Sequence, residues 1–172
     1  MVPEVVIVMG VTGVGKTTLG AALAAERGVP FLEGDAFHPP ENVRKMSAGI
    51  PLQDADRWPW LELLGLAIAA RREPNGAVAT CSALKRAYRD RLRSLIGEPL
   101  LFVCLQADRD AIAARMRARQ GHYMPVTLLD SQLATLELPG RDERAIVLSA
   151  SDSVHDMLAR LRAESRIRSN HA

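Results

Sequence analysis

Eight residues near the start of the chain have the spacing of a phosphate-binding loop. Residues 10–17 read GVTGVGKT, the pattern G-x-x-x-x-G-K-[ST], directly after the apolar run Val5–Met9. The glycines let backbone N–H groups surround phosphate oxygens, Lys16 adds a cation, and the Thr17 hydroxyl is a ligand for Mg²⁺. Lys16–Arg27 then predicts a helix whose N-terminal dipole faces the anion. A chance glycine-rich turn is the alternative, but a strand, loop and helix in register indicate a nucleoside triphosphate site.

A carboxylate stands where the chain leaves the second predicted strand. Val29–Leu32 reads as a short apolar strand, and Asp35 follows it closely. Ligands of parallel sheets bind beyond the carboxyl ends of the strands, so Asp35 can accept or orient the proton of a hydroxyl group bound there. The same position also suits an N-cap for the next helix, and both interpretations remain open from position alone.

Arginines gather at the end of a later predicted helix. The segment Asp108–Arg119 carries four of them, and a glycine follows it. Small kinases close such a segment over bound phosphates, which adds positive charge and excludes water. We therefore expect a lid over residues 115–127, with Arg115 and Arg119 at the phosphates and His122 near the acceptor. A basic face exposed to solvent is the alternative.

The class of nucleotide-binding protein follows from patterns that the sequence lacks. Neither the guanine-binding pattern N-K-x-D nor the switch pattern D-x-x-G occurs, which argues against a GTPase. A large ATPase would need a longer chain and an acidic residue ending a Walker-B strand, whereas the strand Ala77–Cys81 continues into Ser82. A small phosphotransferase needs a hydroxyl acceptor, a carboxylate, cations and a lid, and the chain offers candidates for these parts.

Length and composition fit one α/β domain over residues 1–172. A formal net charge of +2 gives no argument for nucleic acid as a partner. No apolar run reaches the ~18 residues of a membrane span, and the first strand leaves no room for a signal peptide. Cys81 and Cys104 lie in apolar runs without neighbouring metal ligands, so we expect buried free thiols and a cytoplasmic protein.

Continuous apolar strands alternate with helices along the chain. That alternation predicts a five-stranded parallel sheet with helices on both faces. The expected strands are Val5–Met9, Val29–Leu32, Ala77–Cys81, Leu100–Leu105 and Ala145–Leu148. The expected helices run over residues 16–27, 39–46, 58–72, 84–95, 108–119 and 153–168, with Asp54 and Asp56 in a loop before the third helix. Residues 121–125 are expected to break the fifth helix, and a further helix after them is expected to end at about Leu136.

Three further blocks closely resemble bacterial-type gluconokinases. The first spans residues 31–61 and includes Gly34-Asp35, His38-Pro39, Lys45-Met46, Asp56-Arg57 and Trp60-Leu61. The second is Cys81-Ser82-Ala83-Leu84-Lys85 with Tyr88-Arg89-Asp90, and the third is Gly121-His122-Tyr123-Met124 with Ser131-Gln132 and Leu136-Glu137. The resemblance implies a P-loop kinase fold like that of shikimate and adenylate kinases, with a mobile lid. It also implies ATP-dependent phosphorylation of D-gluconate to 6-phospho-D-gluconate and commonly a homodimer.

Cations outnumber carboxylates at the expected acceptor end, which suits a substrate with one carboxylate and several hydroxyls. The chain holds only three lysines among 22 basic residues, which makes Lys45 and Lys85 candidates for a specific role. An ordinary position on the surface is the alternative for both. The expected catalytic residues are Lys16, Asp35 and Arg119, and Thr17 is the expected metal ligand. The expected nucleotide-binding residues are Gly10, Val11, Thr12, Gly13, Val14, Gly15, Lys16, Thr17, Thr18 and Arg115. The expected substrate-binding residues are Asp35, His38, Lys45, Arg57, Ser82, Lys85, Arg89 and His122.

Two other functions remain open from the sequence. The same placement of Asp and Arg would serve a kinase for another hydroxy acid, such as shikimate. A nucleotide-binding regulator without turnover would bind ATP but release no ADP in response to an acceptor; Lys16, Asp35 and the lid arginines argue against it. For His38, a helix-capping position on the surface is the alternative to a contact with the substrate.

Overall fold

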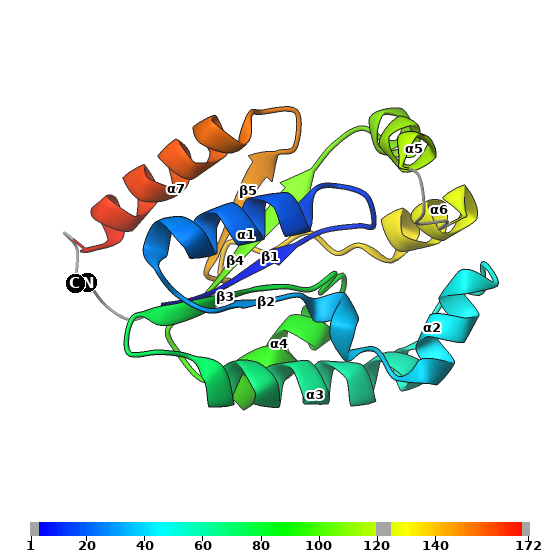
Figure 1. The fold of residues 1–172 in the computed structure, drawn as a ribbon, viewed down its shortest axis with the longest axis horizontal. Helices are drawn as coiled ribbons and strands as arrows, with labels where there is room; N and C mark the ends of the chain where they lie inside the picture. Colours follow the sequence, from blue (N-terminus) through cyan, green and yellow to red (C-terminus); the bar gives the residue numbers. More distant parts are fainter. Residues whose placement is uncertain (1–3, 120–124, 170–172) are drawn as a thin grey trace.

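Five parallel strands form one sheet in the order β2-β3-β1-β4-β5, and the computed structural model describes residues 4–119 and 125–169 of the chain (Figure 1). The strands are β1 (Glu4–Met9), β2 (Phe31–Leu32), β3 (Gly76–Thr80), β4 (Leu100–Gln106) and β5 (Ala145–Ser149). The central strands β1, β3 and β4 are buried almost throughout, as expected where helices cover both faces of a parallel sheet.

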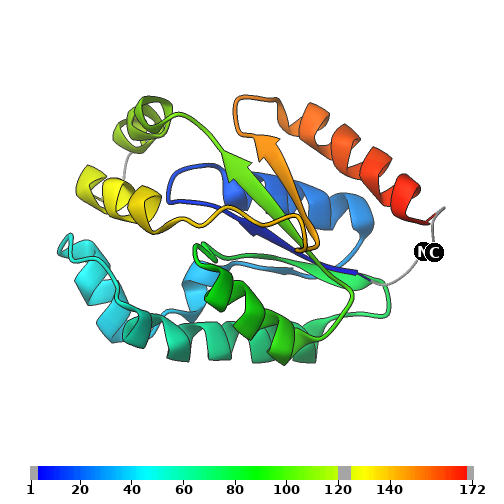
Figure 2. The same cartoon turned by 180° about the vertical axis from the view of Figure 1, so that it is seen from behind.

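Helices cover both faces and gather at one end of this sheet. Helices α1 and α7 lie on one face, whereas α3 and α4 pack together on the other (Figures 1 and 2). Helices α2, α5 and α6 and the 3₁₀ helix η1 lie toward the end where the strands finish. The bounds are α1 (Lys16–Arg27), η1 (Gly34–Phe37), α2 (Pro40–Ser47), α3 (Asp54–Arg71), α4 (Arg86–Ile96), α5 (Arg109–Ala118), α6 (Val126–Thr135) and α7 (Val154–Ser169). The expected α/β fold is confirmed.

Helix α3 begins a full turn earlier than the sequence predicts. Asp54 and Asp56 lie in its first turn and not in a loop. A capping box explains the difference: the Asp56 side chain accepts a hydrogen bond from the backbone N–H of Gln53 at 2.9 Å, and Gln53 caps the helix in return. Acidic side chains also favour the positive end of the helix dipole. Pro59, expected in the first turn, therefore lies further inside the helix.

Two other boundaries shift for local reasons. Helix α4 begins at Arg86 and not at Leu84, because Ala83 has a positive φ of 43° and Lys85 is extended. Strand β2 contains only Phe31 and Leu32, the residues that pair with β3.

The two cysteines are buried free thiols, as the sequence predicts. Cys81 and Cys104 are buried and unpaired, and burial raises the pKa of Cys81 to about 12 and that of Cys104 to about 11. Among the described residues, no helix is long and apolar enough to cross a membrane.

Candidate active site

The loop between β1 and α1 has the backbone geometry that its glycines predict. Gly10 and Gly15 have φ values of 143° and 105°, which residues with a Cβ atom rarely adopt. A Cβ on Gly10 would also lie 2.8 Å from the carbonyl oxygen of Leu105 on β4. The loop can therefore keep this shape, and keep its backbone N–H groups close to a phosphate, only with glycine at these positions.

Lys16 is held within this loop. Its Nζ donates a hydrogen bond to the carbonyl oxygen of Val11 at 2.9 Å. Burial lowers the pKa of the Lys16 ammonium, and the nearby carboxylates of Asp35 and Glu33 oppose that effect. A partly buried cation at the first turn of α1 is suited to meet the oxygens of a bound triphosphate.

Thr17 and Thr80 are joined by a carboxylate that the sequence analysis did not single out. Glu33 accepts a hydrogen bond from the Thr17 hydroxyl at 2.5 Å through one oxygen and from the Thr80 hydroxyl through the other. The Thr80 oxygen accepts the backbone N–H of Gly34 at 3.0 Å. These hydrogen bonds fix the end of β2 against the phosphate-binding loop. They also bring the hydroxyl oxygen of Thr17 and the carboxylate oxygens of Glu33 together.

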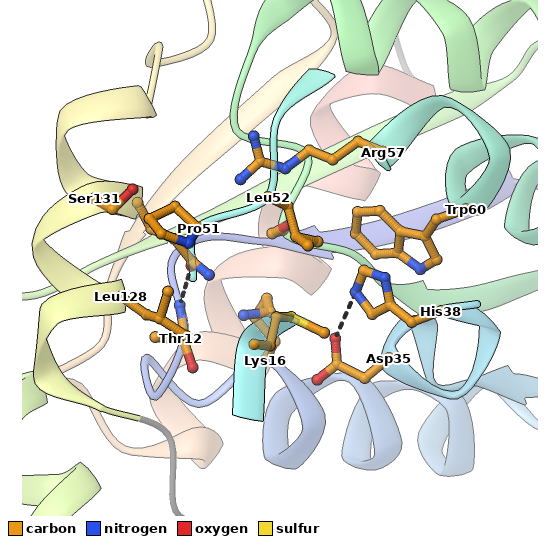
Figure 3. Close-up of a pocket in the computed structure, with 13 residues that line it drawn as sticks. Thr12, Lys16, Asp35, His38, Pro51, Leu52, Arg57, Trp60, Leu128 and Ser131 are labelled. Carbon is orange, nitrogen blue, oxygen red and sulfur yellow. Dashed lines mark hydrogen bonds and ion pairs between the residues drawn. The ribbon is translucent and has the colours of Figure 1, made fainter. Parts of the chain in front are cut away.

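A cleft opens beside the loop and joins it to the residues after β2 (Figure 3). Its polar lining comes from four places: the loop and α1, the segment from η1 to α3, the end of β3, and α6. The polar lining residues are Thr12, Lys16, Asp35, His38, Arg57, Ser82, Ser131 and Gln132, with apolar side chains such as Leu52, Trp60 and Leu128 between them. Of the predicted acceptor-side residues, the structure brings Asp35, His38, Arg57 and Ser82 together here.

His38 lies flat against an aromatic wall of this cleft. Its ring stacks on Trp60 with the centroids 4.0 Å apart, and the Trp60 indole N–H donates to the carbonyl oxygen of Gly34 at 2.8 Å. Nε2 of His38 lies 3.9 Å from a carboxylate oxygen of Asp35, whose side chain is largely exposed. His38 is therefore part of the cleft wall, and its side chain is only 4% exposed, which argues against the surface-cap alternative.

Arg57 enters the cleft from the first turns of α3 and is largely buried (Figure 3). Its guanidinium donates to the Tyr88 hydroxyl at 3.0 Å, and the Tyr88 hydroxyl in turn donates to Asp54. These contacts use part of the guanidinium and hold it in place. Arg57 can therefore present a preorganised cation to an anionic ligand.

Lys45 and Lys85 do not line the cleft. Lys45 pairs with Asp56 at 2.8 Å and Lys85 pairs with Asp54 at 3.0 Å. Both lysines thus neutralise acidic residues that precede Arg57 in the first turn of α3.

Arg89 is placed elsewhere, which corrects its expected role. The side chain is fully buried and forms a bidentate ion pair with Glu143. Its remaining guanidinium nitrogen donates to three backbone carbonyls, those of Ala83, Leu84 and Glu137. With every nitrogen paired inside the protein, Arg89 acts as a structural cross-link and not as a substrate ligand.

Helix α6 lines the cleft and contacts the phosphate-binding loop. The Gln132 carboxamide oxygen accepts a hydrogen bond from the backbone N–H of Thr12 at 2.7 Å. Ser131 and Leu128 of the same helix line the cleft. The helix after the expected lid therefore contacts the loop directly.

The expected lid arginines occupy two different positions. Arg115 of α5 donates to the carbonyl oxygen of Ala150, after β5, at 2.9 Å and more weakly to that of Val14. Arg119 is exposed and extended at the end of α5. Burial is the main cause of the lowered pKa of Lys16, and the positive charge of Arg119 acts in the same direction. His122 and the middle of the expected lid, residues 120–124, lie outside the described residues.

Comparisons with known proteins agree with this geometry. The family model described as AAA domain matches residues 5–139. A gluconokinase from Gluconobacter oxydans is 51% identical over 150 residues, covering 86% of this chain and 83% of the relative. The thermosensitive gluconokinase of Escherichia coli is 48% identical, covering 86% and 79%. The chain belongs to the gluconokinase family. A crystal structure of a gluconokinase from Sinorhizobium meliloti superposes with a TM-score of 0.83 at 45% identity, covering 98% of each chain.

Three residues of the gluconokinase-family site were missed or left without a role by the sequence analysis. Glu33 had only its position after the second strand as a signal, and Gln132 only its place in a family-like block. Asn42 is buried at 3% exposure and donates to the Asp56 carbonyl oxygen at 2.9 Å. Its signals in the sequence are its place in the family-like block over residues 31–61 and its position four residues after His38.

Proposed function

We propose that this protein transfers the γ-phosphoryl group of ATP to a hydroxyl of D-gluconate and forms 6-phospho-D-gluconate and ADP. One observation carries the proposal: the phosphate-binding loop and a separate set of acceptor-type side chains line the same cleft. The relatives named gluconokinase support the identity of the acceptor. In the reaction, the acceptor oxygen forms a bond to the γ-phosphorus while the bond to the β,γ-bridging oxygen breaks.

On the nucleotide side, Lys16 exchanges its contact with Val11 for phosphate oxygens and stabilises the charge that develops on them. Backbone N–H groups of the loop surround the β-phosphate. Arg115 lies between the loop and the segment after β5, where it can meet the nucleotide. Arg119 supplies a further cation from the end of α5.

The oxygen ligands near the loop fit Mg²⁺. The Thr17 hydroxyl and the Glu33 carboxylate are adjacent, and Mg²⁺ prefers oxygen ligands supplied by few side chains together with phosphates and water. Thr17 is the proposed ligand, with Glu33 orienting it or a bound water. Bound there, the metal would supply charge neutralisation to the phosphates.

On the acceptor side, Asp35 accepts the proton that the hydroxyl loses. It is the carboxylate in the cleft lining that lies next to Lys16 and His38. Arg57 pairs with the carboxylate of gluconate, because a guanidinium matches a carboxylate with two parallel hydrogen bonds. Ser82 and His38 donate to its hydroxyls.

The assignment of segments also belongs to this proposal. Residues 35–73 would bind the acceptor within one kinase domain, residues 115–127 would close over the phosphates, and the protein would work as a cytoplasmic homodimer. Size-exclusion chromatography with light scattering tests the homodimer.

A coupled assay of ADP release tests the function directly. We expect release with D-gluconate and little with shikimate, glycerate or nucleoside monophosphates. Lys16→Ala is the matched control, and we expect its turnover to fall by roughly a thousandfold with folding intact. ADP release that depends on shikimate, or that needs no acceptor, would contradict the proposal.

A further inference from the structure

The side chain of Asn42 has only one orientation that its surroundings allow. The carboxamide nitrogen of this buried α2 residue lies 2.9 Å from the backbone carbonyl oxygen of Asp56 and 3.2 Å from Nδ1 of His38. A carbonyl oxygen can only accept a hydrogen bond, so the atom that faces it must be the NH₂ group. That group has two hydrogens, and it can donate one to Asp56 and the other to His38.

The orientation of Asn42 determines where His38 carries its proton. Because Nδ1 receives a hydrogen bond, it must be the unprotonated nitrogen, and the hydrogen of the neutral ring is on Nε2. The stack on Trp60 fixes the ring plane, and the Trp60 indole is itself tied to Gly34. Both the tautomer and the direction of Nε2–H are therefore fixed by the fold.

The fixed N–H group points toward Asp35 without bonding to it. Nε2 and the nearer carboxylate oxygen of Asp35 are 3.9 Å apart, which is too long for a hydrogen bond. Both side chains line the cleft (Figure 3). A substrate oxygen at this place could accept from Nε2–H and, if it is a hydroxyl, donate to Asp35.

We propose that Asn42 is a positioning residue that keeps His38 as a neutral Nε2–H donor to an oxygen of the sugar acid, so that the acceptor proton passes to Asp35. This inference rests on the proposed function for its substrate. It assigns opposite roles to two neighbouring side chains: the His38 ring donates a hydrogen bond from Nε2, and the Asp35 carboxylate accepts one.

The charges around the ring agree with a neutral imidazole. Burial lowers the pKa of His38 to about 4, with the Asp35 carboxylate from η1 opposing this shift and the Arg57 guanidinium from α3 adding to it. Lys16 of α1 lines the same cleft and adds positive charge, whereas Asn42 of α2 is neutral. His38 therefore stays uncharged at neutral pH.

Nuclear magnetic resonance of the ring nitrogens tests the tautomer without any substrate. Long-range ¹H–¹⁵N correlation on the full-length protein at pH 7 should show His38 as the Nε2–H form, assigned by its loss in His38→Gln among the four histidines. In Asn42→Asp the new carboxylate can only accept, so Nδ1 should gain a proton. An Nδ1–H or doubly protonated ring in the unmutated protein overturns the inference, even if Asn42→Asp fails to fold.

A matched pair of substitutions tests the donor in catalysis. Gln and Met have similar lengths, but only Gln presents an N–H group near the position of Nε2. We expect His38→Met to raise the KM for gluconate by roughly tenfold and His38→Gln to raise it clearly less, with the KM for ATP nearly unchanged in both. Glu41→Ala, on the exposed side of α2, is the control. Equal effects of Met and Gln overturn the donor role, whereas a lack of gluconate turnover in the unmutated protein overturns the proposed function and leaves the tautomer result standing.

Discussion

Arg89 and Glu143 form a bidentate ion pair that is closed off from solvent. Arg89 Nε and Nη2 lie 2.7 and 2.8 Å from the two carboxylate oxygens, and the side chains are 0% and 1% exposed. Arg93 adds a third contact to the same carboxylate at 2.9 Å. The pair joins α4 to the segment before β5, and the hydrogen bonds from Arg89 to Ala83 and Leu84 fix the loop that carries Ser82 into the cleft.

Removing one partner of this pair should destabilise the fold. Arg89→Met would leave Glu143 buried without its main partner, so we expect a loss of about 3–5 kcal/mol in the free energy of unfolding. Urea unfolding measures it. Arg91→Ala, which breaks an exposed pair with Glu62, is the control and should cost less than about 1 kcal/mol. Unchanged stability with a raised KM for gluconate would instead restore Arg89 as a substrate ligand.

The same pair predicts how stability changes in acid. The hydrogen bonds from Arg89, and then those from Arg93 and the Gly140 backbone, lower the pKa of Glu143 from 4.5 to about 2. A carboxylate with a lower pKa in the folded state stabilises the fold above its unfolded pKa, and this contribution is lost as pH falls from about 4.5 toward 2. Unfolding curves at several pH values should show a steeper loss for the unmutated protein than for Glu143→Gln. Parallel curves would contradict this.

The fold could be predicted because its signals are local. Apolar runs and helix breaks give the number and order of the strands and α-helices, and parallel pairing follows from their alternation. The boundaries that were wrong depend on contacts between particular atoms. The capping box of Gln53 and Asp56 extends α3, and the positive φ of Ala83 delays α4.

The residues of the candidate site also fall into those that local sequence signals predict and those that depend on tertiary contacts. The phosphate-binding loop and Asp35 could be predicted, since a motif or a strand end specifies each place. Arg89 could not, because its partner Glu143 is 54 residues away in the sequence and only the tertiary structure joins them. The hydrogen bond between Gln132 and Thr12 spans 120 residues and has no signal in the sequence beyond the family-like block.

Asp35→Asn should remove the proton acceptor while keeping the shape of the side chain. An amide does not take the hydroxyl proton, so we expect kcat to fall by roughly a hundredfold or more, the range of a lost general base. The affinity for ATP should barely change, because the phosphates are held by the loop. Steady-state kinetics with both substrates and a separate ATP titration measure the two effects. A kcat within a few-fold of the unmutated value would mean that Asp35 is not the proton acceptor.

Arg57→Lys should weaken gluconate binding without loss of charge. A lysine cannot offer two parallel hydrogen bonds to a carboxylate, nor reach Tyr88 in the same way, so we expect the KM for gluconate to rise by roughly tenfold. Tyr88→Phe keeps the guanidinium but removes its anchor at 3.0 Å, and should give a smaller increase. If Arg57→Lys binds gluconate normally, another cation must meet the substrate carboxylate.

Arg119→Ala tests whether the end of α5 takes part in catalysis. A cation that meets the phosphoryl group mainly in the transition state lowers the barrier more than it strengthens binding. We therefore expect kcat to fall by at least tenfold with little change in the KM for gluconate. Arg117→Ala is the matched control, because Arg117 is also exposed but lies within α5, two residues earlier. An exposed basic face without a catalytic role predicts small and equal effects of both substitutions, as for ordinary surface changes. Rates measured side by side at saturating ATP distinguish the two outcomes, and near-normal turnover in Arg119→Ala would remove Arg119 from the proposed catalytic set.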